Sequence, residues 1–287
     1  MSRKTVFAEL PQPEHIDFGA LARDWIDGRT DLIVVLGPTA SGKTRYAVSL
    51  AEEINAAVAL GYFEGCPFRM TETPLITGAE IISADSRQVY RGMDIGTGKD
   101  LAEYGDIPYH LIDIAEAGSQ YNVYQFQQDF IKAYADIRSR HAVPILCGGT
   151  GMYINSVVCG YDFRSKTPLS ELRENNIREG LPQKPFIIGT LVSRDVRNER
   201  IDRRLDARLE EGMIEEIAGL LKKGVPAETL ISYGLEYKFV TLHLMGELSR
   251  EEMRDKLATA IHQFAKRQMT WFRGMERSGT RIHWIEV

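Results

Sequence analysis

The stretch DLIVVLGPTASGKT, at residues 31–44, decides the fold. Its first six residues are mostly apolar and β-branched, which is typical of a short buried strand. Its tail fits the pattern GxxxxGK(S/T), in which the chain turns through glycines and continues as a helix. Such a turn points backbone N–H groups inward, and the helix adds its positive end. The stretch therefore predicts a phosphate-binding loop.

Two side chains of this loop have predicted roles of their own. Lys43 is expected to reach a terminal phosphate, and the Thr44 hydroxyl is expected to bind Mg²⁺. The predicted phosphate-binding residues are Gly37, Pro38, Thr39, Ala40, Ser41, Gly42, Lys43 and Thr44. The pattern indicates that phosphate is held, and it leaves open whether the ligand is ATP, GTP or another diphosphate.

The bulk composition is that of an ordinary globular α/β protein. The 287 residues are 44% hydrophobic and 26% charged, and no apolar run approaches membrane-spanning length. The start MSRKTVFAELPQPEH lacks the apolar core of a signal peptide. Three cysteines (Cys66, Cys147 and Cys159) are too few and too scattered for a disulfide framework or a zinc site. We expect a cytoplasmic monomer without a membrane partner.

Charge is unevenly distributed along the chain. The formal net charge of −5 argues weakly against a nucleic-acid binder. Residues 254–281, however, contain seven Lys or Arg and two acidic residues. A local basic surface on an acidic protein can still bind a polyanion. A solvated helix face is the simpler interpretation of any single residue there.

Apolar strands alternate with amphipathic helices along the rest of the chain. Further strands are predicted at 79–85, 107–114, 143–149, 185–192 and, as an edge strand, 281–287. Helices are predicted at 18–26, after the loop at 45–54, at 123–141 behind the N-cap Asn122, at 150–160, and at 194–212. Two further helices follow, the second from a capping box of Ser249 and Glu252 to about Phe272. The alternation predicts a P-loop NTPase-like parallel sheet with helices on both faces and a C-terminal helical region.

The predicted domain division follows from the same pattern. Residues 1–30 are interpreted as an N-terminal extension, and residues 31–287 as the core. Within the core, the turn-rich segment 56–78 is interpreted as an inserted loop, and the short polar segment 161–184 as a second interruption.

The carboxyl ends of the predicted strands should share one edge of the sheet, where ligands bind in this class of fold. This places the phosphate-binding loop, Asp85 and the turn at residues 148–150 together. Asp85 ends the strand IISAD and is a candidate metal ligand or general base. Its alternative role is a helix cap, because ADSRQVY can begin a helix.

Arginines of the helix at 194–212 are candidates for neutralising a transferred phosphate. Arg200 and Arg204 are four residues apart and share a helix face, so we favour them over Arg197 and Arg203. Asp195, Glu199, Asp202 and Asp206 interleave with the arginines. Mutual surface pairing is therefore the alternative interpretation.

Seven blocks of this sequence resemble, in order, the tRNA dimethylallyltransferases, also called isopentenyltransferases. They are GPTASGKT, IISADSRQVYRGMDIGTGK, PYHLIDI, YNVYQFQQDF, PILCGGTGMYINSVVCG, RNERIDRRLDARLEEGMIEEI and AKRQMTWFR. The blocks cover most of residues 31–56, 79–160 and 186–277. The phosphate-loop block is generic, whereas the second and last blocks are specific.

The resemblance implies that the loop holds the diphosphate of dimethylallyl diphosphate, and that the acceptor is the exocyclic amine of the adenosine beside the anticodon of tRNA. It implies that Asp85 is the general base and that the diphosphate leaves with Mg²⁺. Catalytic roles are implied for Thr39, Lys43, Asp85, Arg200 and Arg204, and contacts to the tRNA anticodon stem-loop for Asp85, Ser86, Arg87, Gln88 and Thr150. The backbone at 148–151 is expected to admit the flat prenyl chain.

Two departures from the family pattern keep alternatives open. Segment 161–184 stands where most members insert a sizeable helical domain that grips the anticodon arm, so it is interpreted as a shortened tRNA-binding insertion. Segment 56–78 is extra. A free adenine nucleotide is therefore an alternative acceptor.

Two other classes of protein compete with this interpretation. An ATP-dependent P-loop kinase is disfavoured because the strand VPILCGG ends in glycines and not in a metal-binding carboxylate. A non-catalytic RNA-binding relative is disfavoured by the intact set of Thr39, Lys43, Thr44 and Asp85.

Overall fold

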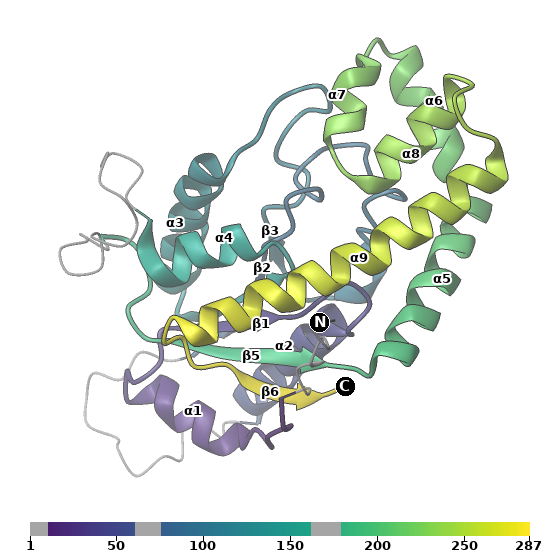
Figure 1. The fold of residues 1–287 in the computed structure, drawn as a ribbon. Helices are drawn as coiled ribbons and strands as arrows, with labels where there is room; N and C mark the ends of the chain where they lie inside the picture. The colour runs from purple at the N-terminus through teal and green to yellow at the C-terminus, as the bar shows by residue number, and fades with distance from the viewer. Residues whose placement is uncertain (1–10, 61–75, 162–178) are drawn as a thin grey trace.

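The computed structural model describes residues 11–60, 76–161 and 179–287 (Figure 1). In this part of the chain, six strands form one sheet in the order β3-β2-β4-β1-β5-β6. All neighbouring strands pair in parallel, as predicted. The strands are β1 (Leu32–Leu36), β2 (Gly78–Ser83), β3 (Tyr109–His110), β4 (Ala142–Gly148), β5 (Pro185–Leu191) and β6 (His283–Glu286).

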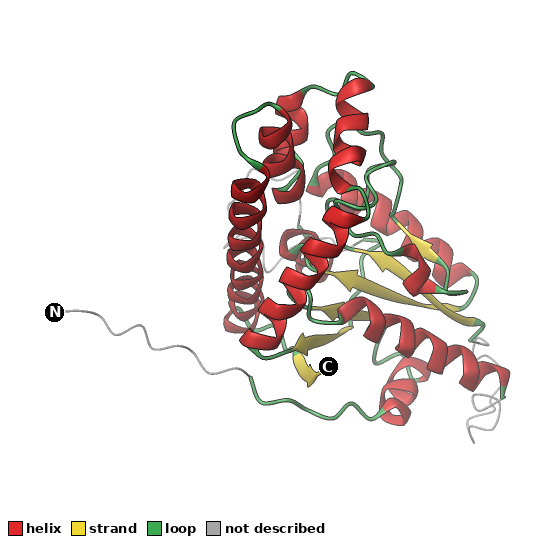
Figure 2. Cartoon of the chain, turned by 90° about the vertical axis from the view of Figure 1, so that its right-hand side faces the viewer, coloured by secondary structure: helices red, strands yellow, loops and turns green. Residues whose placement is uncertain are grey.

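Helices cover both faces of the sheet, which Figure 2 shows from the side. They are α1 (Phe18–Ile26), α2 (Lys43–Ala59), α3 (Val123–Ser139), α4 (Gly151–Asn155), α5 (Arg194–Glu210), α6 (Met213–Lys222), α7 (Ala227–Ser232), α8 (Leu235–Leu244) and α9 (Arg250–Arg277). A 3₁₀ turn spans Leu101–Tyr104, and a π-helical turn, Ser156–Gly160, follows α4. The predicted caps are present, because Asn122 and Ser249 both form capping boxes.

The alternation of side chains along β1 builds two hydrophobic layers. Leu32, Val34 and Leu36 face the layer of α3, α4 and α9, whereas Ile33 and Val35 face the layer of α1 and α2. All five side chains are buried, as expected for a strand that is covered on both faces. A third hydrophobic cluster joins α5, α6, α8 and α9. Helix α9 crosses from that cluster toward the start of β5, and thus connects the helices α5, α6 and α8 with the sheet (Figure 1).

Three predicted elements differ from the structure. The strand expected at 107–114 contains only two strand residues, because Leu111 and Asp113 adopt left-handed backbone angles (φ 63° and 56°). Four helices, and not two, follow α5, because Pro226 and Gly234 (φ 150°) interrupt the helical pattern. The last of them continues beyond Phe272 to Arg277.

The N-terminal extension and the two segments predicted to interrupt the core agree only in part with the structure. Helix α1 spans the predicted residues, and Phe18 and Trp25 pack against the α2 layer. Helix α2 extends to Ala59, into the segment interpreted as an inserted loop. Residues 61–75 of that loop, and residues 162–178 of the shortened insertion, lie outside the described residues. The domain division therefore stays a prediction.

The loop between β2 and β3 is fixed from two sides. The Lys99 ammonium, with a side chain only 1% exposed, donates to the Tyr90 carbonyl and the Asp94 carboxylate at 2.7 Å each and also contacts Asp113. The Glu216 carboxylate accepts the backbone N–H groups of residues 94–96 at 2.7–3.1 Å. These contacts hold the loop against the carboxyl edge of the sheet.

Candidate active site

The predicted phosphate-binding loop links β1 to α2 at the carboxyl edge of the sheet. Gly42 takes a left-handed conformation (φ 81°) directly before the helix begins at Lys43. The first turn of α2 has no side-chain cap, which leaves its N–H groups available to an anion. The loop is anchored to β5 by a buried hydrogen bond of 2.6 Å between the Ser41 and Thr190 hydroxyls. A Cβ on Gly37 would lie 2.1 Å from the Thr190 Oγ1, so only glycine fits there.

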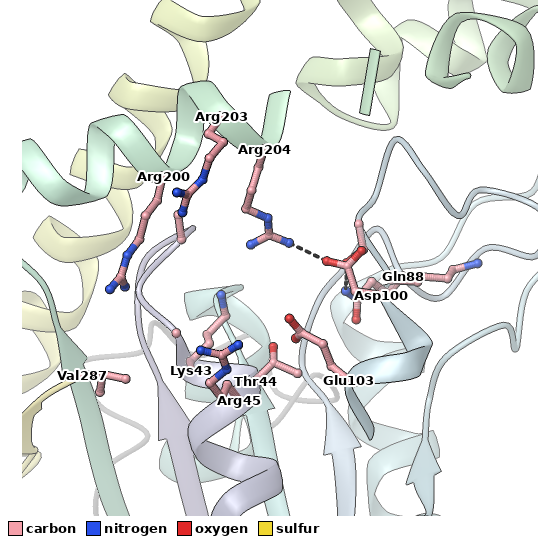
Figure 3. A pocket seen from close by; sticks show the side chains of 14 residues that line it. Lys43, Thr44, Arg45, Gln88, Asp100, Glu103, Arg200, Arg203, Arg204 and Val287 are labelled. Carbon is pink, nitrogen blue, oxygen red and sulfur yellow. Dashed lines mark hydrogen bonds and ion pairs between the residues drawn. The ribbon is translucent and has the colours of Figure 1, made fainter. Parts of the chain in front are cut away.

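A cavity of about 440 Å³, which we call the outer cavity, lies above this loop. Figure 3 shows Arg200, Arg203 and Arg204 extending from α5 toward the Lys43 and Thr44 side chains of α2. Arg45, Asp100 and Glu103 complete the polar wall. The outer cavity is therefore strongly cationic on the α2 and α5 sides, as a site for a polyanion requires.

A smaller cavity of about 60 Å³, which we call the inner cavity, adjoins the outer cavity and is lined by Asp85. The two cavities share lining residues Ala40, Lys43, Thr44, Gln88, Gly98 and Arg204. The inner cavity adds Thr39, Arg87 and Glu236, together with Gly148. A phosphate group on the loop and a second reactant beside Asp85 can thus meet in one continuous space.

Lys43 lies where the two cavities meet. Its Nζ is 3.5 Å from the Pro38 carbonyl oxygen, which is a long and weak hydrogen bond. Burial lowers the pKa of Lys43, an effect partly opposed by the Asp85 carboxylate. An anionic ligand would supply the strong partner that the ammonium lacks in the described structure.

Asp85 is held by its neighbour Arg87. The Asp85 Oδ1 accepts the Arg87 backbone N–H at 2.9 Å and lies 3.6 Å from the Arg87 Nε. The Arg87 Nη1 also donates to the Glu236 Oε2 at 2.6 Å. Burial by itself lowers the pKa of Arg87, but the carboxylates of Glu236 and Asp85 outweigh that effect and raise the pKa. Residues 86–89 form turns, so the helix-cap interpretation of Asp85 is wrong.

The other residues predicted to contact tRNA surround Asp85. The Thr150 Oγ1 accepts the Ser86 backbone N–H at 3.0 Å, which joins the ends of β2 and β4. Gln88 lines both cavities and donates to the Gly98 carbonyl at 3.2 Å. Asp85, Arg87 and Gln88 therefore line the inner cavity, whereas Ser86 and Thr150 bond to each other at its edge.

The α5 arginines that line the outer cavity are not only the two that the sequence analysis favoured. Arg200 and Arg204 line the outer cavity as predicted, but Arg203 lines it too, and Arg197 is buried away from both cavities. Arg204 pairs with Asp100 at 2.7 Å, and within the described ranges Arg200 and Arg203 have no ion-pair partner.

The acids of α5 do not cancel these charges. Asp206 binds Arg254 at 2.9 Å, and Asp202 lies 2.9 Å from the His262 Nε2. Asp202 and Asp206 thus face α9. Mutual pairing along α5 is therefore the wrong interpretation of the interleaved acids.

Comparison with known proteins agrees with this geometry. The model of the IPP transferase family matches residues 88–181 and 163–275. The chain belongs to the IPP transferase family. It is 45% identical to tRNA dimethylallyltransferase 1 of Parabacteroides distasonis (90% of this chain, 92% of the relative) and 47% identical to tRNA dimethylallyltransferase 1 of Porphyromonas gingivalis (89% and 94%).

Solved structures of the family share the fold. The full-length tRNA isopentenylpyrophosphate transferase of Bacillus halodurans superimposes with a TM-score of 0.71 at 28% identity, over 89% of both chains. The Staphylococcus epidermidis enzyme of the same kind gives a TM-score of 0.69 at 28% identity, over 89% of this chain and 92% of that one. The P-loop α/β fold that the sequence predicts is thereby confirmed. None of the helices in the described ranges is long and apolar enough to cross a bilayer.

Sequence reasoning missed Gln268, which connects the phosphate loop to the other side of the site. Its Oε1 accepts from the Thr39 backbone N–H at 2.8 Å and from the Thr39 hydroxyl at 3.2 Å. Its Nε2 donates to the Gly149 carbonyl at 2.9 Å. Gln268 belongs to the block AKRQMTWFR, one of the two specific family blocks, and this was the available signal.

Two more site residues were missed. Arg208 lies one turn beyond Arg204 and lines the inner cavity, a position that the i,i+4 spacing indicates. A Cβ on Gly98 would lie 1.6 Å from the Arg208 Nη2, so that glycine leaves room for the guanidinium. Glu236, the partner of Arg87, had no signal of its own.

The expected slot for a prenyl chain at 148–151 stays a prediction, and the structure gives a different reason for two of its glycines. A Cβ on Gly149 would lie 2.5 Å from the Gln268 Nε2, and one on Gly151 would lie 2.2 Å from the Trp271 Cδ1. Side chains of α9 thus already cover these two residues, and close packing is what requires glycine there. Gly148 does line the inner cavity.

We expect Gln268→Met to destabilise the fold by about 1–3 kcal/mol, because the partly buried Thr39 N–H and the buried Gly149 carbonyl lose their partner. Chemical denaturation monitored by circular dichroism measures the change. Gln263→Met, at an exposed position of the same helix, is the matched control and should change stability by less than about 0.5 kcal/mol. Equal effects of the two substitutions would contradict the bridging role of Gln268.

Proposed function

We propose that this protein transfers a dimethylallyl group from dimethylallyl diphosphate to the exocyclic amine of the adenosine beside the anticodon of tRNA, and releases diphosphate. The observation that carries the proposal is the continuity of a cationic cavity above the phosphate loop with a smaller cavity that contains Asp85. The names of the relatives, tRNA dimethylallyltransferases over about 90% of this chain, supply the donor and the acceptor class.

The reaction breaks the bond between the allylic carbon and the diphosphate oxygen and forms a bond from that carbon to the adenine nitrogen. An adenine amine is a weak nucleophile, so positive charge develops on the allylic carbon and negative charge on the departing diphosphate. Donors that are already in place stabilise this negative charge without reorganising. In this site they are the loop N–H groups, the Lys43 ammonium and the guanidinium groups of Arg200, Arg204 and the adjacent Arg203.

The proton of the amine leaves as the new bond forms. Asp85 lies in the inner cavity, and its Oδ1 is fixed by the Arg87 backbone N–H. A carboxylate within hydrogen-bond reach of the amine is a suitable base for this transfer. The ion pair of Arg87 with Glu236 keeps the guanidinium from turning into the outer cavity.

Magnesium fits this site with the substrate as its main ligand. Among the described residues no cluster of three or more His, Cys, Asp or Glu side chains is arranged to hold a metal ion. Mg²⁺ commonly keeps several waters and binds through one or two protein oxygens and the phosphates of the substrate. We propose that the Thr44 hydroxyl binds it, where the cation would neutralise charge on the diphosphate.

The kinase alternative has little support in this geometry. In P-loop kinases and ATPases a strand-end carboxylate beside the loop organises the metal. Here the residue beside Lys43 at the end of β4 is Cys147, and burial raises the pKa of its thiol to about 12. The strand therefore presents a neutral group where a kinase of this class needs an anion.

We also propose that the protein acts as a monomer in the cytoplasm. Cys147, which is buried, forms no disulfide within the described ranges, and reduced thiols are common in a reducing compartment.

The direct test is an assay with Mg²⁺, dimethylallyl diphosphate and unmodified tRNA, followed by mass spectrometry of the digested nucleosides. We expect a prenylated adenosine from tRNA and none from adenosine monophosphate under the same conditions. Transfer to the free nucleotide alone would replace the proposed acceptor, and ATP hydrolysis without prenyl transfer would replace the reaction.

Two substitutions should separate the roles of the two cavities. We expect Asp85→Asn to lower kcat by about 10²–10⁴-fold through loss of the base, while binding of an unreactive donor analogue stays intact. We expect Lys43→Ala to lower kcat by about 10²–10³-fold and also to weaken binding of the donor analogue. Rates come from the tRNA assay and affinities from calorimetry.

Asp106→Asn and Lys132→Ala are the matched controls, since both residues are exposed and line neither cavity. Both controls should behave like the unmodified protein. An Asp85→Asn variant with a normal rate, or a Lys43→Ala variant with normal analogue binding, would contradict the assigned roles.

A further inference from the structure

Tyr104 brings a hydroxyl to the inner cavity that the rest of the protein does not use. Four other neutral side chains of this cavity donate hydrogen bonds to protein groups, namely Thr39, Ser83, Gln88 and Thr97. The Tyr104 side chain lines the cavity too, and its hydroxyl forms no hydrogen bond with the part of the chain that the structure describes. This hydroxyl is therefore available to a ligand.

The Tyr104 ring is buried, but its hydroxyl is open to the cavity. The residue is only 3% exposed. Its oxygen keeps accessible surface, whereas unpartnered atoms such as the Arg197 Nε are sealed from solvent. The buried tyrosines Tyr90, Tyr134 and Tyr237 instead use their hydroxyls within the protein, at 3.2, 3.1 and 2.8 Å. Because a buried hydroxyl is costly without a hydrogen bond, Tyr104 is suited to a partner that enters the cavity.

The fold holds the Tyr104 ring in one place. Tyr104 ends the 3₁₀ turn Leu101–Tyr104, and Gly105 (φ 52°) turns the chain directly after it. The ring belongs to the hydrophobic layer of α1 and α2, and the centre of the Tyr109 ring lies 5.0 Å from its own. The hydroxyl is thus positioned before a ligand arrives, which reduces the entropy lost on binding.

The Tyr104 hydroxyl is a hydrogen-bond donor at neutral pH. Burial, together with the Asp85 carboxylate, raises the pKa of Tyr104 above its ordinary value, so the phenol stays protonated. Tyr104 and Asp85 both line the inner cavity, and neither lines the outer cavity, where the diphosphate is proposed to bind. The partner of the hydroxyl is therefore the reactant beside Asp85 and not the diphosphate.

The chemistry of the two reactants identifies that partner. A dimethylallyl group contains no hydrogen-bond acceptor. Adenine carries an acceptor nitrogen on each side of its exocyclic amine, N1 on the pairing edge and N7 on the opposite edge. A carboxylate that accepts from the amine and a hydroxyl that donates to the adjacent nitrogen match this pattern. Guanine has an oxygen in place of the amine, and that oxygen would face the Asp85 carboxylate.

We propose that the Tyr104 hydroxyl donates a hydrogen bond to a ring nitrogen beside the amine of the target adenine. The proposal rests on the proposed function and deepens it, because it assigns a residue that selects the base. A base without an acceptor at this position leaves a buried donor unpaired, which penalises its binding. The bond also fixes the ring around its contact with Asp85, so the amine is held in one orientation for the reaction.

The test combines Tyr104→Phe with single-atom changes in an anticodon stem-loop RNA. The target adenosine is replaced by 1-deazaadenosine or 7-deazaadenosine, each of which lacks one of the two nitrogens. With adenosine, we expect Tyr104→Phe to lower kcat/KM roughly 10-fold, while the melting temperature and the binding of the donor analogue stay unchanged. With the RNA that lacks the bonded nitrogen, Tyr104→Phe should lower kcat/KM by less than about twofold.

Tyr109→Phe is the matched control. It removes a hydroxyl from the adjacent ring, which is 40% exposed and lines neither cavity, so kcat/KM should stay within about twofold for all three RNAs. A loss that disappears with one of the two analogues supports the inference and identifies N1 or N7 as the acceptor. A normal kcat/KM of Tyr104→Phe with adenosine, or equal losses with all three RNAs, would overturn it.

RNA affinity separates this inference from the proposed function. The same set of variants and RNAs can be compared by fluorescence anisotropy with labelled RNA, which needs no turnover. RNA that binds without being prenylated would refute the proposed reaction, and an affinity loss in Tyr104→Phe that depends on one ring nitrogen would still support the inference. Failure of the unmodified protein to bind any of the RNAs would overturn both.

Discussion

The site depends on one electrostatic constraint: a carboxylate must lie beside a cationic cavity without neutralising it. The phosphate loop, Lys43 and the α5 arginines attract an anion, and Asp85 lies in the adjoining space. Direct pairing of Asp85 with Lys43 would disable both groups. The structure prevents this by holding Asp85 on the Arg87 backbone N–H and side chain, at 2.9 and 3.6 Å.

Other ion pairs at the site keep the remaining charges apart. Arg87 is fixed by Glu236 at 2.6 Å, and the raised pKa of the guanidinium ensures that it stays protonated beside Asp85. Arg204 is held by Asp100, while burial and Arg204 lower the pKa of Arg208. Positive charge accumulated at this density is costly without an anion. A bound diphosphate would relieve that cost, and more strongly as its charge increases during bond cleavage.

Helix α9 gives the site its rigidity. Gln268 holds the phosphate loop to the turn after β4, and Trp271 covers the start of α4. Groups that are fixed before the reaction do not need to reorganise as charge develops, and this preorganisation is a large part of catalysis in such sites.

The sequence was sufficient to predict the features that local chemistry determines. The loop at Gly37–Thr44, the parallel sheet and the position of Asp85 follow from a buried strand, a glycine turn and strand-end polarity. Contacts between distant segments were not predictable in this way. Gln268 binds Thr39 across 229 residues of chain, and Glu236 binds Arg87 across 149.

The features that the sequence analysis did not predict correctly also depend on contacts between distant segments of the chain. The shortening of β3 reflects left-handed residues that the Lys99 network stabilises through Asp113, and no periodicity in 107–114 shows it. The glycines at 149 and 151 are required by side chains of a helix more than a hundred residues away, and from sequence alone they resemble a ligand slot. Helix breaks at Pro226 and Gly234 were visible in the sequence, but tertiary packing in the third cluster determines that three separate helices form.

The most direct test of this account is a crystal structure of the protein with an unreactive dimethylallyl diphosphate analogue and an anticodon stem-loop RNA. The account predicts the diphosphate on the Gly37–Thr44 loop and the Asp85 carboxylate at about 3 Å, within hydrogen-bond reach, from the exocyclic amine of an extruded adenosine. A diphosphate bound elsewhere, or an adenosine amine separated from Asp85 with the carboxylate still held only by Arg87, would contradict it.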